Sequence, residues 1–188
     1  MRIGILGGTF NPIHLGHLIL AEEIREKLAL DKVIFVPAYL PPHKDNTEIA
    51  AADARLGMVK LAIAGNPCFC VSDIEIKRSG RSFTIDTVKE FRRAYPGDEL
   101  YFITGSDLLK YLEEWKDLEE ILKIVKFIVA TRPGFPLEDI PTYISTIAIR
   151  AVDISAFEIR SRIKNSRSFR YLVPEAVFKY IGKKKLYI

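Results

Sequence analysis

Residues 7–17 constrain the fold more than any other part of this sequence. They read GGTFNPIHLGH, and they lie between a short apolar run, residues 3–6, and an amphipathic run, residues 18–30. This order predicts a strand, a tight glycine turn and a helix. Glycine has no Cβ, so the turn can approach a ligand closely, and the following helix offers unpaired N–H groups and a positive dipole end to an anion. The stretch is therefore typical of a phosphate site in an α/β protein.

Two histidines fall within this stretch. His14 and His17 are three residues apart, so both side chains can lie on one side of the junction between loop and helix. Imidazole donates hydrogen bonds well to phosphate oxygens, and it can be charged near neutral pH. The alternative is a surface turn with incidental histidines, but the chain has only three histidines in all. Neither G-x-G-x-x-G nor G-K-[ST] occurs, which excludes the two commoner phosphate motifs.

Short apolar runs alternate with amphipathic runs along the rest of the chain. The pattern predicts an α/β fold, with one Rossmann-like, doubly wound parallel sheet, helices on both faces and a single domain over residues 1–188. In such a sheet, ligands bind at the carboxyl ends of the strands. We expect strands at residues 2–7, 33–36, 69–71, 100–103, 126–130 and 147–152, an extended segment at 71–76, and helices at 15–29, 50–64, 84–94 and 174–181.

Composition limits the class of protein. Residues 150–188 hold ten Lys/Arg and three Asp/Glu, a net charge of +7, and the whole chain has +4, which leaves −3 for residues 1–149. A basic end suits anionic substrates such as nucleotides, and a solvated helix surface is the alternative.

Cys68 and Cys70 have neither metal nor redox spacing, so we expect reduced thiols on a buried strand of a cytoplasmic protein. No run approaches the roughly 20 apolar residues of a membrane span, so no membrane partner is expected.

The pattern G-G-T-F-N-P-I-H-x-G-H resembles the signature of the nucleotidylyltransferase superfamily, G-[GS]-[FT]-[DF]-x-H-x-G-H. Within that superfamily, the whole chain most resembles the bacterial nicotinate-nucleotide adenylyltransferases. Asn11 stands where many members have aspartate, and both residues suit a turn. The resemblance implies transfer of AMP from ATP to nicotinate mononucleotide, giving deamido-NAD and pyrophosphate without a covalent enzyme intermediate. It also implies Mg²⁺ that arrives with ATP, and no metal site made by the protein alone is evident in the sequence.

The resemblance assigns phosphate contacts to several residues. His14 and His17 would donate to the α- and β-phosphates, and Lys44 and Arg160 would neutralise the triphosphate. Lys44 and His43 follow two prolines beyond the second expected strand, where a loop His-Lys pair without the resemblance is more often solvated. The backbone of the glycine turn would bind ATP through Gly7, Gly8, Thr9 and Phe10.

A second phosphate segment follows the last expected strand. Ser155 can cap a helix, with Glu158 three residues on to complete a capping box. The segment resembles the family motif I-S-[ST]-[ST]-x-I-R, in which Ser155 and Arg160 match and bind ATP. Ala156 and Phe157 replace hydroxyl residues of that motif, which leaves backbone N–H groups and Arg160 as the contacts there.

Residues 73–87 resemble the family block D-x-E-x-x-R-x-G-x-[ST]-[YF]-T-x-D-T, whose loop holds the pyridine carboxylate. Thr84 can cap the helix expected at 84–94, and a helix N-terminus suits a carboxylate. A capped helix without a ligand is the alternative.

Further nicotinate mononucleotide contacts are implied after the fourth expected strand. Gly105 and Asp107 belong to a G-[SA]-D triplet that lines the family's site, where Asp107 would hold a ribose or a metal-bound water. Tyr111 and Trp115 are four residues apart, so a helix would place them on one face near the pyridine. Core packing is the alternative that the pattern alone favours for Trp115. Arg132, before Pro-Gly, matches another family feature.

Three other functions remain open at this point. The first is an adenylyltransferase for nicotinamide mononucleotide or phosphopantetheine, and the second is a non-catalytic nucleotide sensor on the same fold. The third is an RNA-binding protein that uses the basic carboxyl-terminal end, but the chain lacks interleaved aromatic residues there, so no nucleic-acid partner is expected. The oligomeric state is open, a homo-oligomer included.

Overall fold

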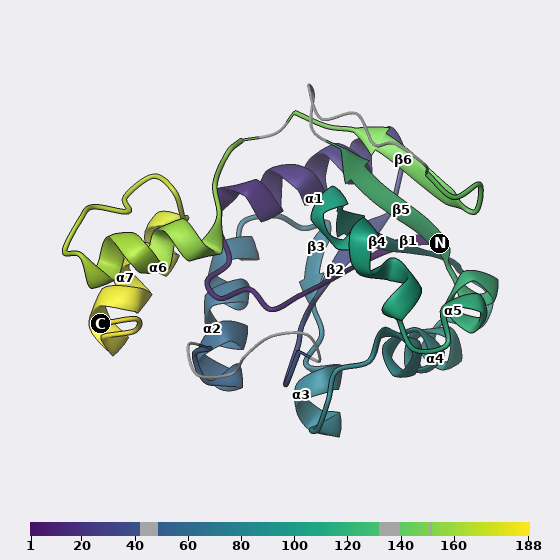
Figure 1. Cartoon of the computed structure of the whole chain (residues 1–188), viewed down its shortest axis with the longest axis horizontal. Coiled ribbons are helices and arrows are strands. Elements are labelled where there is room, and N and C mark those ends of the chain that lie inside the picture. The colour runs from purple at the N-terminus through teal and green to yellow at the C-terminus, as the bar shows by residue number, and fades with distance from the viewer. Residues whose placement is uncertain (42–48, 132–139, 151) are drawn as a thin grey trace.

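The computed structural model describes residues 1–41, 49–131, 140–150 and 152–188 of the chain, and it contains one six-stranded sheet (Figure 1). All neighbouring strands are parallel, in the order β3-β2-β1-β4-β5-β6. The predicted doubly wound parallel sheet is confirmed. The strands are β1 (Arg2–Gly8), β2 (Lys32–Pro37), β3 (Phe69–Val71), β4 (Glu99–Gly105), β5 (Lys126–Thr131) and β6 (Ile144–Ala148).

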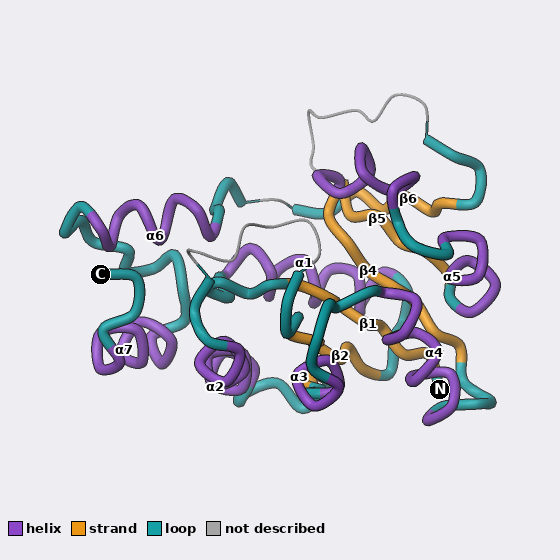
Figure 2. Tube along the Cα trace, turned by 60° about the horizontal axis from the view of Figure 1, so that its bottom comes forward, coloured by secondary structure: helices purple, strands orange, loops and turns teal. Residues whose placement is uncertain are grey.

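Helices cover both faces of the sheet. One layer contains α1 (Leu15–Lys27), α2 (Ala52–Ile63), α6 (Ala156–Lys164) and α7 (Glu175–Lys184). The other contains α3 (Ile74–Arg78), α4 (Thr84–Ala94), α5 (Leu118–Ile124) and the 3-10 helix η2 (Ser106–Glu114). Both views place α6 and α7 beside α2, at the opposite end of the molecule from α4 and α5 (Figures 1 and 2).

The central strands are buried on both faces because successive side chains point to opposite sides of a sheet. In β2, Val33 and Phe35 pack with the α1 and α2 layer, whereas Ile34 and Val36 pack with the α4 layer. The short apolar runs at β1, β2, β4 and β5 therefore correspond to strands that both layers cover, whereas β3 and β6 lie at the edges of the sheet. No helix among the described residues is long and apolar enough to cross a membrane.

The expected extended segment at residues 71–76 is wrong. β3 ends at Val71, and α3 begins at Ile74. The backbone turns because Ser72 Oγ accepts a hydrogen bond from the N–H of Ile74, and the N–H of Lys77 donates to the carbonyl of Asp73 at 2.8 Å. Serine and aspartate commonly initiate such turns through local hydrogen bonds, so a short apolar alternation here belongs to a helix and not to a strand.

Two other expectations fail at the sheet edges. The last strand is β6 (Ile144–Ala148) and not 147–152, because pairing with β5 ends where Thr131 faces Ala148. Cys70 is exposed and Cys68 is partly exposed, since β3 is an edge strand and not a buried one.

Two predicted helix starts shift by one residue. Phe83 is the N-cap of α4 and Thr84 its first helical residue, whereas Pro174 is the N-cap of α7 instead of its first helical residue. The capping role expected for Thr84 is therefore not observed.

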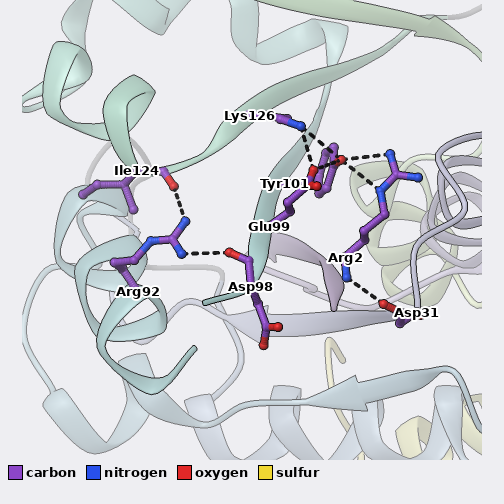
Figure 3. A network of polar contacts seen from close by, with 8 residues as sticks. All are labelled: Arg2, Asp31, Arg92, Asp98, Glu99, Tyr101, Ile124 and Lys126. Carbon is purple, nitrogen blue, oxygen red and sulfur yellow. Dashed lines mark hydrogen bonds and ion pairs between the residues drawn. The ribbon is translucent and has the colours of Figure 1, made fainter. Parts of the chain in front are cut away.

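The strand order reverses between β1 and β4. This is the switch point at which open α/β sheets bind ligands, outside the carboxyl ends of the strands. Gly8 and Gly105 are the last residues of these two strands, so the predicted phosphate turn and the predicted G-S-D triplet lie at this edge. The opposite edge carries a network of charged residues around Tyr101 and Arg92 (Figure 3).

Candidate active site

The glycine turn after β1 is shaped by Phe10. This residue has φ 48° and is 2% exposed, and its ring packs against Phe35 with the centroids 5.9 Å apart. A Cβ on Gly8 would lie 3.0 Å from the Phe10 ring, which is closer than ordinary van der Waals contact. The glycine therefore lets the phenyl ring fold beneath the turn, and Gly7, Gly8, Thr9 and Phe10 stand at the carboxyl end of β1 as predicted.

His14 and His17 form a stacked pair at the start of α1. Their ring centroids lie 3.7 Å apart with an interplanar angle of 29°, which confirms the expectation that both lie on one side of the loop–helix junction. The backbone N–H of His14 donates to Nδ1 of His17 at 3.2 Å. Because Nδ1 accepts this hydrogen bond, a neutral His17 ring carries its proton on Nε2 and can donate from there.

Gly16 makes room for the histidine pair. A Cβ at this position would lie 3.0 Å from Nδ1 and 3.1 Å from Cε1 of His14. His14 is buried, and the His17 ring meets Phe10 edge-on with centroids 5.1 Å apart. The glycine between the two histidines is thus a packing requirement of the site.

Asn11 joins the glycine turn to distant parts of the chain. Its Oδ1 accepts from the N–H of Ala50 at 3.0 Å and from the hydroxyl of Tyr187 at 2.8 Å. Burial raises the pKa of the Tyr187 phenol, and nearby Arg160 and Arg55 oppose this rise. The phenol therefore stays protonated as a donor, which suits an amide or carboxylate acceptor at position 11.

Arg160 reaches the same turn from α6. Its NH1 donates to the carbonyl of Asn11 at 3.0 Å. Ser155 caps α6, and its Oγ accepts from the N–H of Glu158 at 3.1 Å, which confirms the predicted N-cap. The Glu158 carboxylate accepts from Arg162 at 2.8 Å. Arg160 thus joins α6 to the glycine turn, and the ATP contacts that the resemblance implies for Ser155 and Arg160 stay predictions.

The loop before α4 is tied to the loop after β2. The N–H of Ser82 donates to the carbonyl of Leu40, and Ser82 Oγ accepts from the N–H of Tyr39, both at 2.9 Å. Thr84 follows at the start of α4 and is half-buried. The predicted pyridine-side loop therefore lies at the carboxyl edge of β2.

Glu75 and Arg78 hold α3 against α4. Thr87 Oγ1 donates to the buried carboxyl of Glu75 at 2.5 Å, and Arg78 NH1 lies 2.7 Å from Glu90 Oε1. Burial raises the pKa of Glu75, and hydrogen bonds from Thr87 and Ser82 lower it. Glu75 and Arg78 of the 73–87 block thus join the two helices that flank the loop.

Trp115 packs against the core. It lies just after η2, is partly buried, and meets Phe102 and Phe127 edge-on with centroids 5.8 and 5.6 Å apart. The expectation of an α-helical face shared with Tyr111 is wrong, because η2 is a 3-10 helix that ends at Glu114. A 3-10 helix has three residues per turn, so positions four apart do not superpose.

Of the remaining predicted site residues, the structure describes Gly105 but not the side chains of the others. Gly105 ends β4 at the expected edge. The side chains of Asp107 and Tyr111, and the residues His43, Lys44 and Arg132, lie outside the described part of the chain.

Arg55 is not among the site residues predicted from the sequence. It is 1% exposed and donates to three backbone carbonyls around the site: Ala50 at 2.9 Å, Thr9 at 2.8 Å and Tyr39 at 3.0 Å. A signal was present, because Arg55 shares the helical spacing i, i+3, i+4 with the buried Met58 and Val59. A cation on the apolar face of a helix indicates a specific set of partners.

Comparison with known proteins shows the family of the chain. A family model described as cytidylyltransferase-like matches residues 5–162. A Thermus thermophilus protein named "Probable nicotinate-nucleotide adenylyltransferase" is 48% identical over 187 residues, which cover 100% of both chains. The chain belongs to the nicotinate-nucleotide adenylyltransferases of the cytidylyltransferase-like family.

A second relative matches in length, and a solved structure has a similar fold. A Moorella thermoacetica protein of the same name is 48% identical over 198 residues, covering 99% of this chain and 91% of that one. The solved Plasmodium falciparum nicotinic acid mononucleotide adenylyltransferase complexed with NaAD superposes with a TM-score of 0.81 at 21% identity, over 99% of this chain and 97% of that chain. At this identity the solved structure supports the fold alone.

Proposed function

We propose that this chain transfers AMP from ATP to the 5′-phosphate of nicotinate mononucleotide, forming deamido-NAD and releasing pyrophosphate. The observation that carries the proposal is the stacked pair of His14 and His17 at the switch point of the sheet. The names of relatives that match the full chain support the same reaction. This is a nucleotidyltransferase step of NAD biosynthesis.

The reaction needs no covalent enzyme intermediate. An oxygen of the nicotinate mononucleotide phosphate forms a bond to the α-phosphorus of ATP, and the bond from that phosphorus to the bridging oxygen breaks. The electron pair leaves with pyrophosphate. Catalysis of this kind depends on aligning both substrates and on stabilising charge in the transition state.

The histidine pair supplies donors for that charge. His17 would donate from Nε2, because its Nδ1 accepts from the backbone of His14. His14 would act beside it on the neighbouring phosphate, and the stacking fixes the relative position of the two rings. Donors held rigidly where charge develops are worth far more than donors in water.

The remaining phosphate contacts come from the turn and from α6. Gly7, Gly8, Thr9 and Phe10 would present backbone groups to ATP. Arg160 would neutralise phosphate charge, since its guanidinium is held at the turn by the carbonyl of Asn11. Ser155 would contribute through the N-terminus of α6, and Lys44 through its ammonium group.

The pyridine nucleotide would bind across the β4 side of the switch point. Thr84 begins α4, a helix of 11 residues whose N-terminus attracts a carboxylate. Gly105, Asp107, Tyr111, Trp115 and Arg132 complete the proposed site. Trp115 would contribute through the part of its ring that Phe102 and Phe127 leave accessible.

The donor set of the site fits a metal that travels with ATP. Among the described residues, no group of three His, Cys, Asp or Glu side chains could hold a metal ion. The side chains at the turn are imidazoles and a guanidinium, which suit phosphate oxygens. Mg²⁺ would arrive with ATP and would supply further neutralisation of the leaving group.

Cellular location and assembly are further parts of the proposal. Free thiols at Cys68 and Cys70 suit a reducing cytoplasm. We place the enzyme there, as a single domain, with a homo-oligomer as the assembly to test.

The test is pyrophosphate release from ATP and Mg²⁺, with nicotinate mononucleotide, nicotinamide mononucleotide and phosphopantetheine in parallel reactions. Release with the acid far above the other two substrates is the expected result. Equal release with acid and amide would make the enzyme dual-specific. No release with any of them, from folded protein that still binds ATP, would contradict catalysis and favour a nucleotide sensor.

A further inference from the structure

We infer that Arg55 is a positioning residue that sets the spacing between the phosphate turn and the pyridine-side loop. This inference rests on the proposed function, because it concerns how ATP and the acceptor phosphate are held relative to each other. Arg55 itself binds neither substrate. It acts through the backbone of three segments that meet beneath the site.

The contacts of Arg55 reach both halves of the site. NH1 donates to the carbonyl of Thr9, in the phosphate turn, at 2.8 Å. NH2 donates to the carbonyl of Tyr39, in the loop after β2, at 3.0 Å. Nε donates at 2.9 Å to the carbonyl of Ala50, whose own N–H donates to Asn11 of the turn. One planar guanidinium therefore fixes three segments in one arrangement.

A short path continues from Arg55 to the pyridine side. Tyr39 receives the Arg55 hydrogen bond on its carbonyl, and its N–H donates to Ser82 Oγ at 2.9 Å. Ser82 lies two residues before Thr84, where α4 begins. The path from Thr9 through Arg55 to Ser82 therefore includes only one residue of the loop after β2, which is Tyr39. A change at Arg55 is therefore transmitted to both substrates.

Burying the Arg55 guanidinium costs free energy, which indicates that its hydrogen-bond geometry is needed. The side chain is 1% exposed, and desolvation lowers its pKa. Its hydrogen-bond partners are neutral carbonyls, which repay less of the desolvation than a carboxylate would. A guanidinium offers five donors in a rigid fork, whereas a lysine ammonium is a point charge on a flexible stem. Lysine would keep the charge and lose the three-way geometry.

Arg92 provides a matched control at the far edge of the sheet. It donates to the carbonyls of Asp98 at 2.8 Å and Ile124 at 2.9 Å (Figure 3). It also donates to the carbonyl of Tyr95 at 3.2 Å. Like Arg55, it joins separate segments through backbone carbonyls. It lies at the amino-terminal edge of the strands, away from both substrates, so its loss reports the structural cost alone.

The experiment compares Arg55→Lys with Arg92→Lys in the full-length protein. Both variants are first ranked by melting temperature, and kcat and KM for ATP and nicotinate mononucleotide are then measured well below the lower melting temperature. We expect both to melt earlier than wild type. We expect Arg55→Lys to lose about tenfold or more in kcat, because small misplacement of reacting groups is costly. Its KM values should change by no more than about threefold, since the groups that bind substrate remain.

The outcomes separate this inference from the proposed function. A wild-type enzyme without turnover would overturn both. An active wild type, with kcat of Arg55→Lys within twofold of Arg92→Lys, would overturn the positioning role alone. If Arg55→Lys does not fold, Arg55→Gln is measured in its place, because it buries no ammonium and still donates to one carbonyl. Failure of both variants to fold would show that Arg55 is purely structural.

Discussion

The imidazole rings of His14 and His17 stack 3.7 Å apart, and the backbone of one holds the ring nitrogen of the other. This relationship orients the His17 Nε2 donor before any substrate binds. Preorganised donors need no rearrangement when charge develops in the transition state. This electrostatic stabilisation is usually the largest contribution to the rate enhancement. Substitutions at the pair and in its surroundings therefore test the arrangement directly.

Replacing His17 with alanine should remove one transition-state donor. We expect kcat to fall by roughly 10²–10³, as for the loss of a single donor to developing charge. Because His17 is only partly buried, the melting temperature should change little. Steady-state pyrophosphate release and circular dichroism measure the two effects. Near-normal turnover by folded His17→Ala protein would contradict the catalytic assignment.

Gly16→Ala should disturb the histidine pair without removing either ring. The new methyl group would lie 3.0 Å from Nδ1 of His14, so the ring must move. We expect kcat to fall by about tenfold, since a displaced donor loses part of its effect.

Gly182→Ala, in α7, is the matched control, because a Cβ there meets nothing within 4 Å. This variant should keep full activity and gain about 0.5–1 kcal/mol of stability, as alanine is the better helix former. Urea unfolding and turnover are measured for both variants. Equal activity of Gly16→Ala and Gly182→Ala would show that the stack tolerates the methyl group.

Tyr187→Phe should loosen the carboxyl-terminal end from the glycine turn. The phenol donates to Asn11 Oδ1, and its loss should lower the free energy of unfolding by about 1 kcal/mol. Tyr171→Phe is the control, because Tyr171 is 79% exposed and should have no effect. Urea titrations of the two variants decide the prediction, and identical midpoints would show that the Tyr187 hydrogen bond contributes nothing.

The sequence predicts what depends on local pattern. Short apolar runs identify the strands because central strands of a parallel sheet are buried on both faces. Ser155 is recognisable as an N-cap because its partner, Glu158, lies three residues away. The positions of His14 and His17 on one side of the loop–helix junction are predictable because the two residues are only three positions apart. Each of these signals lies within one turn of helix or one strand.

Contacts between distant segments have no such signal. The hydrogen bond from Tyr187 to Asn11 joins residues 176 positions apart, and the Arg55 contacts join segments as far apart as 46 positions. The end of β6 depends on where its partner β5 ends. The packing of Trp115 on Phe102 and Phe127 is the alternative that the pattern favours, but no periodicity in the sequence predicts that η2 is a 3-10 helix. These features follow from tertiary packing.

The last prediction concerns acid stability and the edge of the sheet opposite the site. Glu99 Oε2 accepts from Lys126 Nζ and from the Tyr101 hydroxyl, both at 2.7 Å (Figure 3). These hydrogen bonds lower the pKa of Glu99 from 4.5 to about 2. A lowered folded-state pKa means that the stabilisation is fully present above pH 4.5, and is lost as the pH falls through about 2.

Comparison of wild type with Glu99→Gln measures this effect. The difference between their urea midpoints should be constant at neutral pH, and it should shrink between pH 4.5 and 2. The groups are exposed to solvent, so the difference should also shrink in high salt. Turnover at neutral pH should match wild type, because Glu99 begins β4 at the edge away from the histidine pair. A difference that grows on acidification would contradict the lowered pKa of Glu99.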